Sequence, residues 1–352
     1  MADFIRIEKM TIIIVGGGKM GLSHLAIASQ ILGSKNVVLC ETNLLMRFLY
    51  KRLGIKTYSS VELALAACSE IKGAIISTPT PSHYLIAKLF LENSIPCFIE
   101  KPLTLSAKKS LHLLSLSLDK KVYAQMGFVL RYVSSFSKLR DLLQSNALGP
   151  PLGYSVQMTG NVITKSDSKS WRTNFAAGGG CLNEYGPHLI DLCRFIFGDV
   201  AVVNGAKKSH VFSENADDRI NFEWTHDSGV AGKAKLDWCD PNKRKSIIEF
   251  TINFQGAEVS ANNSALHFTF NDACTLTLDE RIQISKSSVP PRVGFYLRGE
   301  EYSLQLEDFI GKCVNQICRV DSKFGIGNSA ELSDGLAVDQ LIESIALKAE
   351  LV

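Results

Sequence analysis

Short apolar segments alternate with amphipathic helical patterns over residues 1–127 of the chain. The apolar segments, which predict strands, lie at 11–15, 37–41, 73–77, 96–99 and 121–126. The segments between them, which repeat apolar positions at helical spacing, are Met20–Leu32, Leu44–Leu53, Val61–Ala67, Ser82–Leu91 and Ala107–Leu118. Strands that alternate with helices in this way are typical of a parallel sheet with helices on both faces. The pattern predicts an N-terminal α/β domain over 1–127.

The pattern changes to a period of two from about residue 153 to residue 285. In the segment 219–224, for example, Ile220, Phe222 and Trp224 fall on one face. Further strands are expected at 230–238, 246–254, 265–270 and 273–279, with one helix at about 184–197 and two more at roughly 302–318 and 331–350. These elements predict an α/β domain with a large, mostly antiparallel open sheet over 128–330. A C-terminal helix within 331–352 is expected to pack back on the first domain.

The strands of this second domain carry many apolar residues, which we interpret as lying on both sides of the sheet. Helices of the same domain cover one face of such a sheet, and the other face then meets solvent or a partner. We therefore expect a homodimer or homotetramer that is joined through the open face.

Composition narrows the class of protein. The chain has 352 residues, of which 46% are hydrophobic and 21% charged, and its formal net charge is +3. This balance makes no electrostatic case for nucleic acid or for a membrane surface. The nine cysteines include no Cys-x-x-Cys pair and lie mostly in apolar runs, which indicates free thiols in a reducing compartment. With no apolar stretch of the roughly 18 residues that a membrane span needs, and no signal-peptide core, we expect a cytoplasmic protein.

A glycine-rich turn follows the first predicted strand. Gly16-x-Gly18-x-x-Gly21 comes directly after the apolar run 12–15 and opens the first helix. The first glycine permits a tight turn, the second lets backbone approach a pyrophosphate, and the third lets the helix pack on the strand. Glu41, at the end of the second strand, suits the two hydroxyls of an adenosine ribose and repels a 2′-phosphate. The turn and this acid together predict a site for NAD rather than NADP.

Two further strand ends carry polar residues that point to the same edge of the sheet. Thr78-Pro79 and His83 follow the third strand, and Glu100-Lys101-Pro102 follows the fourth. Ligands of open parallel sheets bind beyond the carboxyl ends of the strands. His83 has an alternative, which is to cap or pack at the start of its helix.

Oxidation of a hydroxyl carbon also requires an acid/base group for the hydroxyl proton. Lys101 is the candidate on the first domain, because a partly buried lysine near a positive charge can lose its proton near working pH. His188 is the candidate on the second domain, because an imidazole titrates near neutrality. Glu184 lies one helical turn before His188, and Gly178-Gly-Gly180 before them provides backbone freedom.

Asp191 lies one turn after His188 and either orients its ring, caps the helix or is solvated. A histidine with two nearby carboxylates also raises the question of a metal. The set has no second histidine or cysteine at ligand spacing, so we expect none.

Taken together, these residues resemble the Gfo/Idh/MocA oxidoreductases, named for glucose–fructose oxidoreductase and inositol dehydrogenase, and the resemblance covers essentially the whole chain. The residues that carry it are the glycine turn 16–21, Thr78-Pro79 with His83, Glu100-Lys101-Pro102, Arg131, Trp171-Arg172, Gly178–Gly180 with His188 and Asp191, and Ser333–Gly335. The resemblance implies a Rossmann domain followed by an α/β domain with a large open sheet. It also implies NAD(P)-linked oxidation or reduction of a sugar, cyclitol or sugar nucleotide.

The resemblance further implies roles for single residues. Lys101 and His188 are expected in catalysis, and Arg131, Trp171 and Arg172 near nicotinamide or substrate. Glu184 stands where the family often has aspartate, which leaves its role open, and Asn183 and Tyr185 are candidates for substrate hydroxyl contacts. The segment 298–302 with Gln305 and Phe309 is similar to members that act on sugar nucleotides, and it adds Tyr302 as a substrate residue.

The expected site is then as follows. The catalytic residues are Lys101, His188 and Glu184. The cofactor-binding residues are Gly16, Gly18, Lys19, Met20, Gly21, Glu41, Thr78, Pro79, His83, Glu100, Lys101, Trp171 and Arg172. The substrate residues are Lys101, Arg131, Arg172, Asn183, His188 and Tyr302. Two other functions stay open: an NAD-dependent glycosidase of the same fold, and a non-catalytic regulator that keeps the dinucleotide site.

Overall fold

The structure is a computed structural model that describes residues 10–165, 170–271, 275–279, 299–314 and 327–352. The chain forms two compact units. The first comprises Met1–Thr104, Lys108–Gly127 and Val289–Leu336, and the second comprises Leu105–Ala107, Phe128–Ser288 and Ala337–Val352.

The first unit is built on a six-stranded sheet in the order β3-β2-β1-β4-β5-β6, in which every pair is parallel. Its strands are β1 (Thr11–Val15), β2 (Val37–Cys40), β3 (Thr57–Tyr58), β4 (Ile71–Ile76), β5 (Cys97–Ile99) and β6 (Ala124–Met126). The strands β2 and β3 lie on one side of β1, and β4, β5 and β6 follow on its other side, which is the arrangement of dinucleotide-binding sheets. The predicted parallel sheet is confirmed, and β3 is the one strand of this unit that the apolar pattern did not mark.

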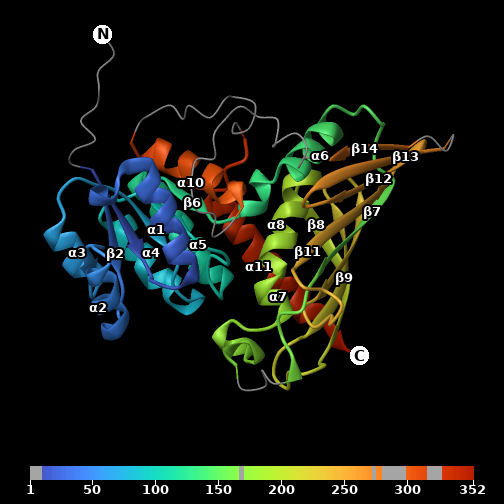
Figure 1. The fold of residues 1–352 in the computed structure, drawn as a ribbon. Coiled ribbons are helices and arrows are strands. Elements are labelled where there is room, and N and C mark those ends of the chain that lie inside the picture. The colour runs from blue at the N-terminus through green and yellow to red at the C-terminus, as the bar shows by residue number, and fades with distance from the viewer. Residues whose placement is uncertain (1–9, 166–169, 272–274, 280–298, 315–326) are drawn as a thin grey trace, which may run out of the picture. The chain divides into compact units, whose positions relative to one another are not determined.

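Helices connect the strands of this sheet. They are α1 (Lys19–Leu32), α2 (Leu44–Arg52), α3 (Val61–Ala67), α4 (His83–Glu92) and α5 (Ala107–Lys120), with short 3-10 turns η2 (Ser34–Asn36) and η3 (Thr80–Ser82). Figure 1 shows α1, α2 and α4 around the blue and teal strands. Because the strands are buried on both sides, Ile12, Ile14 and Phe98 have no exposed surface.

One helix of the first unit comes from far along the chain. The expected domain boundaries place α10 (Glu300–Cys313) in the second domain, but Leu306, Phe309 and Ile310 pack into the core cluster of the first unit, beside Ile12 and α1. The final helix α11 (Leu332–Lys348) also differs from expectation, because its residues from Ala337 onward group with the second unit. Chain order alone gave no signal for either assignment, since both helices are amphipathic and can cover any apolar surface.

The second unit is built on a nine-stranded sheet in the order β14-β13-β12-β11-β7-β10-β9-β8-β15. Its strands are β7 (Gly153–Thr159), β8 (Val200–Ser209), β9 (Arg219–His226), β10 (Ala231–Asp237), β11 (Ile247–Asn253), β12 (Ala257–Asn262), β13 (Ala265–Phe270), β14 (Thr275–Asp279) and β15 (Ala349–Leu351). Only the pairs β7–β10 and β8–β15 are parallel among these strands. The prediction of a large, mostly antiparallel sheet is confirmed.

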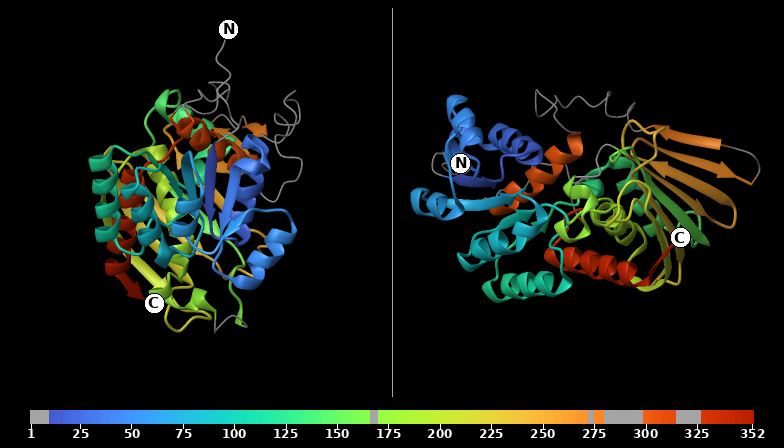
Figure 2. Two further views of the ribbon diagram at one scale, coloured as in Figure 1. Left: turned by 90° about the vertical axis from the view of Figure 1, so that its left-hand side faces the viewer. Right: turned by 90° about the horizontal axis from the view of Figure 1, so that it is seen from below.

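Helices cover one face of this sheet. They are α6 (Ser134–Gln144), α7 (Cys181–Glu184) and α8 (Gly186–Phe197), preceded by the 3-10 turns η4 (Val129–Tyr132), η6 (Trp171–Thr173) and η7 (Phe175–Ala177). The Phe197 ring of α8 stacks on Tyr154 of β7 with the ring centroids 3.9 Å apart. Figure 1 and the right-hand view of Figure 2 show α8 lying along this face.

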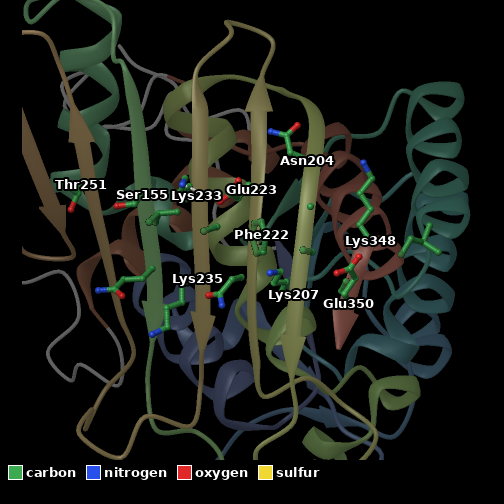
Figure 3. A pocket seen from close by; sticks show the side chains of 18 of the residues that line it. Ser155, Asn204, Lys207, Phe222, Glu223, Lys233, Lys235, Thr251, Lys348 and Glu350 are labelled. Carbon is green, nitrogen blue, oxygen red and sulfur yellow. Dashed lines mark ion pairs between the residues drawn. The ribbon is translucent and has the colours of Figure 1, made fainter. Parts of the chain in front are cut away.

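The other face of the sheet is polar, which corrects the expectation of apolar residues on both sides. In β9, Ile220, Phe222 and Trp224 are buried, whereas Asn221 and Glu223 between them are exposed. The same alternation in β10 and β11 lines a broad hollow with lysine, glutamate and amide side chains (Figure 3). Successive side chains of a strand point to opposite faces, so most of the apolar residues that we assigned to two faces occupy one, with Val202 and Leu276 among the exposed exceptions.

Within the described residues, no helix is long and apolar enough to cross a membrane.

Candidate functional site

The glycine turn between β1 and α1 has three glycines in three different surroundings. Gly16 has a φ of 98°, a conformation that favours glycine. A Cβ on Gly21 would lie 1.8 Å from the Gly16 carbonyl oxygen, so the first turn of α1 packs directly on the loop. A Cβ on Gly18 would meet nothing within 4 Å. Gly18 also begins α1 with no side-chain cap, which leaves backbone N–H groups at the helix N-terminus for an anion.

Glu41 is fixed beside this turn. Its Oε2 accepts the Gly17 backbone N–H at 2.8 Å, and its Oε1 accepts the Asn43 backbone N–H at 2.7 Å. The Tyr50 hydroxyl donates to the Gly17 carbonyl oxygen at 2.6 Å. Each carboxylate oxygen keeps lone pairs for further donors. The structure therefore holds a carboxylate next to the glycine turn.

His83 is placed differently from a ligand-contacting residue. Its side chain is only 1% exposed, and its ring nitrogens lie 3.0 Å from the Pro102 carbonyl oxygen and 2.8 Å from the Thr78 carbonyl oxygen. Burial lowers the pKa of this imidazole despite these carbonyls. His83 thus joins the loop after β4 to the loop after β5 from within the unit. In the loop after β4, which His83 contacts, Thr78 is half-buried and Pro79 is exposed.

Glu100 and Lys101 lie at the carboxyl end of β5, as expected. Glu100 Oε1 lies 2.7 Å from Nε2 of His24, a residue of α1 that sequence reasoning did not mark. Glu100 Oε2 lies 3.3 Å from the Lys101 backbone nitrogen and accepts its N–H. Lys101 is half-buried. The only sequence signal for His24 was a histidine on the buried face of α1, where most positions are apolar.

In the second unit, the glycine run shapes a loop rather than an open surface. Gly178 and Gly180 have φ values of 88° and 98°, and a Cβ on Gly179 would lie 2.2 Å from the Arg172 carbonyl oxygen. Gly180 N–H donates to that same carbonyl oxygen at 2.9 Å. The close backbone approach is therefore between the glycine run and η6, which carries Trp171 and Arg172.

Trp171 and Arg172 form the exposed side of this loop. Trp171 is 49% exposed, and the Arg172 guanidinium carbon lies 4.9 Å from its ring centroid. Arg172 Nε is buried and has no hydrogen-bond partner in the described part of the chain. An aromatic face and an unused buried donor on one turn are suited to a ligand with a flat ring and an acceptor.

His188 and Glu184 lie on either side of a break between two helices. α7 ends at Glu184, Tyr185 separates the helices, and α8 begins at Gly186 with Pro187 in its first turn. Both His188 and Glu184 are half-buried. Asp217, another residue that the sequence did not mark, positions α7 because its Oδ2 accepts the Leu182 N–H at 2.7 Å. Burial raises the pKa of Asp217 to about 6.

Asn183 and Tyr185 are buried and bonded within the unit. The Asn183 amide donates to the Gly179 carbonyl oxygen at 2.8 Å, and the Tyr185 hydroxyl lies 2.5 Å from the Ser246 hydroxyl. Burial raises the pKa of Tyr185 to about 12. These contacts stabilise the loop and the helix in which the two residues lie, and they do not support the substrate contacts that we expected of them.

Arg131 and Asp191 also differ from expectation. The Arg131 guanidinium binds the Asp191 carboxylate through Nε at 2.9 Å and through a second nitrogen at 2.5 Å, with side-chain exposures of 6% and 0%. A solvated role for Asp191 is therefore wrong. The two charges pair in a bidentate contact between η4, which carries Arg131, and α8, which carries Asp191, since burying either charge alone would be costly.

Tyr302 lies in the first unit, where it packs partly buried against the core cluster that includes Phe309. Its expected substrate contact has no support from this placement. Arg298, which completes the same motif, lies outside the described residues.

Comparison with known proteins places the chain in a family. Residues 10–128 match the model of an oxidoreductase family with an NAD-binding Rossmann fold, and residues 136–261 match the GFO/IDH/MocA C-terminal domain. The chain belongs to the GFO/IDH/MocA family. The resemblance that we drew from the motifs and the expectation of an NAD-binding domain are thereby confirmed.

Curated relatives are distant. The rhizopine catabolism protein MocA of Rhizobium meliloti is 26% identical over 185 residues, which cover 53% of this chain and 56% of that protein. Glucose-6-phosphate 3-dehydrogenase of Bacillus subtilis is 27% identical over 187 residues, which cover 52% of this chain and 53% of that protein. The chain thus spans about half the length of the curated relatives that it matches.

Solved structures resemble the whole chain in fold. Levoglucosan dehydrogenase in complex with NADH and levoglucosan superimposes with a TM-score of 0.79, at 19% identity over 97% of each chain. UDP-N-acetylglucosamine 3-dehydrogenase of Acidithiobacillus ferrooxidans superimposes with a TM-score of 0.72, at 16% identity over 97% of this chain and 98% of that one. At these identities the likeness establishes the fold alone.

The different surroundings of Gly18 and Gly21 lead to a prediction. Gly18→Ala should leave stability within about 0.5 kcal/mol of the original, as for other substitutions without a clash, yet weaken NAD binding, because the new methyl group enters only the space of the ligand. Gly21→Ala should weaken both, because its methyl group collides with Gly16. Urea unfolding and NAD titration by calorimetry measure the two effects. Equal NAD affinity in Gly18→Ala would show that the pyrophosphate does not approach this turn.

Proposed function

We propose that this protein is an NAD-dependent oxidoreductase that acts on a hydroxyl or keto carbon of a sugar, cyclitol or sugar nucleotide, with Lys101 and His188 as proton-transfer groups. The observation that carries the proposal is the placement of Lys101, at the carboxyl end of β5 in the same sheet as the glycine turn and Glu41. Strand ends on that edge are where ligands of such sheets bind. Family membership supports the reaction class.

The residues of the glycine turn fit the cofactor. The open space at Gly18 and the uncapped start of α1 suit a pyrophosphate, and the Glu41 carboxylate suits ribose hydroxyls. When bound, NAD supplies the carbon that exchanges a hydride with the substrate. Trp171 and Arg172 are proposed to contact cofactor or substrate from η6, with Arg172 Nε as a donor.

Lys101 and His188 are proposed to handle the proton. A hydroxyl carbon that gives up a hydride must also release its hydroxyl proton, and a positioned base lowers the barrier to that release. In the reverse direction the same group returns the proton to the keto oxygen. Glu184 is the last residue of α7 and lies four positions before His188 in sequence. It is proposed to assist the proton transfer. His83 and Glu100 act on the cofactor side by holding the loops that carry Thr78 and Lys101.

The proposed substrate class draws on the relatives. Their names include scyllo-inositol 2-dehydrogenase of Bacillus subtilis, which is 25% identical over 54% of this chain. A polyhydroxylated ring is the feature common to that substrate, glucose 6-phosphate and levoglucosan. A panel of sugars, cyclitols and sugar nucleotides tested for reduced nicotinamide would identify the substrate. Accumulation of reduced nicotinamide would also exclude the glycosidase alternative for that compound, because a glycosidase returns the hydride.

The proton-transfer pair leads to a prediction. Lys101→Ala should lower kcat by about 10²–10⁴, the range for a positioned acid/base, and leave NAD affinity largely unchanged. His188→Ala should do the same, without additivity in the double variant, because both act on one proton. Steady-state kinetics on the identified substrate and the pH profile of kcat/KM provide the measurement. Near-normal turnover in both alanine variants would mean that the proton is handled elsewhere.

Glu41 leads to a second prediction, on cofactor choice. The protein should prefer NAD, because a carboxylate repels a 2′-phosphate. Glu41→Ala should narrow that preference, whereas Glu62→Ala, which removes another acid of the same unit, should not. The ratio of kcat/KM for the two cofactors is the measure, and a tenfold advantage for NADP in the unchanged protein would contradict the prediction.

Assembly leads to a third prediction. The open face of the nine-stranded sheet carries exposed lysines and glutamates, including the cross-strand pair Lys233–Glu223 at 3.5 Å. We propose that a second copy covers this face as a homodimer or within a homotetramer, because a surface with both charge signs can be complementary to itself across a two-fold axis. Lys233→Glu with Lys235→Glu should weaken the association. Light scattering that gives a monomer of 38.6 kDa at micromolar concentration would contradict assembly.

A further inference from the structure

A histidine of the cofactor-binding helix reaches the loop that carries Lys101. His24 lies in the second turn of α1, and its side chain has no exposed surface. Its ring packs against Phe98 in an edge-to-face arrangement at a centroid distance of 5.4 Å. Its Nε2 lies 2.7 Å from Glu100 Oε1, and because an ionised carboxylate only accepts, Nε2 is the donor.

The other ring nitrogen of His24 makes no contact that competes with Glu100. Nδ1 is buried and has no hydrogen-bond partner in the described part of the chain. Among the described residues, the hydrogen bond from Nε2 to Glu100 is therefore the polar contact that fixes this ring.

Glu100 has little room to move. Its Oε1 accepts from His24, and its Oε2 accepts the Lys101 backbone N–H at 3.3 Å. A Cβ on Gly127 would lie 2.9 Å from Oε2, which shows how closely the next strand end bounds the carboxylate. Burial alone would raise the pKa of Glu100, but the hydrogen bond and the charge interaction with His24, together with the positive charge of Lys101, outweigh it, and the pKa is lowered. Glu100, whose side chain is 14% exposed, is therefore a mostly buried anion.

Among the described residues, three titratable groups face this anion from three elements. They are His24 from α1, Lys101 from the loop after β5, and His83 from α4. His83 holds the Pro102 carbonyl oxygen, so the two neighbours of Lys101 in the chain are each held by a buried histidine. Lys101 is the member of this cluster that the proposed reaction uses.

We propose that His24 is a positioning residue for Lys101. Its hydrogen bond holds the Glu100 carboxylate at the backbone N–H of Lys101, and this position determines how strongly the negative charge of Glu100 acts on the Lys101 ammonium group. The inference deepens the proposed function and rests on it, since it assigns the control of a proton-transfer group. It also links α1, whose N-terminus receives the pyrophosphate, with the loop that carries the proton.

The test is the pH dependence of Lys101 reactivity in the full-length protein, which needs no substrate. Trace labelling with acetic anhydride, read by mass spectrometry, reports the fraction of each lysine that is unprotonated, and the exposed Lys108 serves as internal control. In His24→Leu the carboxylate loses its donor and turns toward the ammonium group. The labelling midpoint of Lys101 should then move up by about one pH unit, a tenfold change in the proton equilibrium, while Lys108 stays unchanged.

Two further variants separate positioning from packing. His24→Gln keeps a hydrogen-bond donor and should restore the original midpoint. In the Glu100→Gln background, His24→Leu should have no further effect, because the charge that His24 directs is gone. If His24→Leu does not fold, the single variants His24→Gln and Glu100→Gln still decide, since a midpoint displaced in His24→Gln as far as in Glu100→Gln would overturn the proposal. An unmoved or lowered midpoint in a folded His24→Leu protein would overturn it as well.

Turnover distinguishes this inference from the proposed function. With an identified substrate, His24→Leu should lower kcat about tenfold below the midpoint, in proportion to the unprotonated amine, with KM and NAD affinity unchanged. Normal turnover in Lys101→Ala would remove the proposed function yet leave the labelling result intact. A displaced midpoint with unchanged kcat would mean that His24 does control the protonation of Lys101, but that this protonation does not limit catalysis.

Discussion

The contact between Gly16 and Gly21 is the constraint on which the first unit depends. The backbone of α1 meets the carbonyl of the loop so closely that no Cβ fits between them. This contact sets where α1 begins, and so where its free N–H groups point. It also sets where His24 enters the core, since a helix fixed at its first turn places its second turn as well. Glu41 and Glu100 then meet Gly17 and α1 at hydrogen-bond distance.

The same logic recurs in the second unit with different residues. A glycine run packs on the backbone of η6, and Asp217 holds the start of α7. Arg131 of η4 and Asp191 of α8 neutralise each other. In each case a polar or charged group is buried because a partner satisfies it, which restricts the position of the chain around His188 more than apolar packing alone would. A residue that a motif suggests as a ligand contact can thus instead hold neighbouring residues in place through contacts within the protein.

The open sheet illustrates how a surface is assigned. Its outward face is lined by lysine, glutamate and amide side chains (Figure 3), while Phe222, Trp224 and Phe250 fill the inward face. A polar face needs no cover to be stable in water, so partner binding there would rest on charge complementarity rather than on apolar burial. This face is also hollowed, so a partner can match both its shape and its charge.

The sequence by itself determined the elements whose signals are local: five of the six strands of the parallel sheet and the helices between them, the glycine turn with Glu41, and the strand end that carries Lys101. Period, turn residues and spacing report these because each involves neighbours along the chain. Only the tertiary structure decided that α10 joins the first unit, that Arg131 pairs with Asp191, and that His24 reaches Glu100 across 76 positions. Such partners are distant in sequence, and several amphipathic or charged residues would satisfy the local pattern equally well. The choice among them is made by packing, which the order of residues does not display.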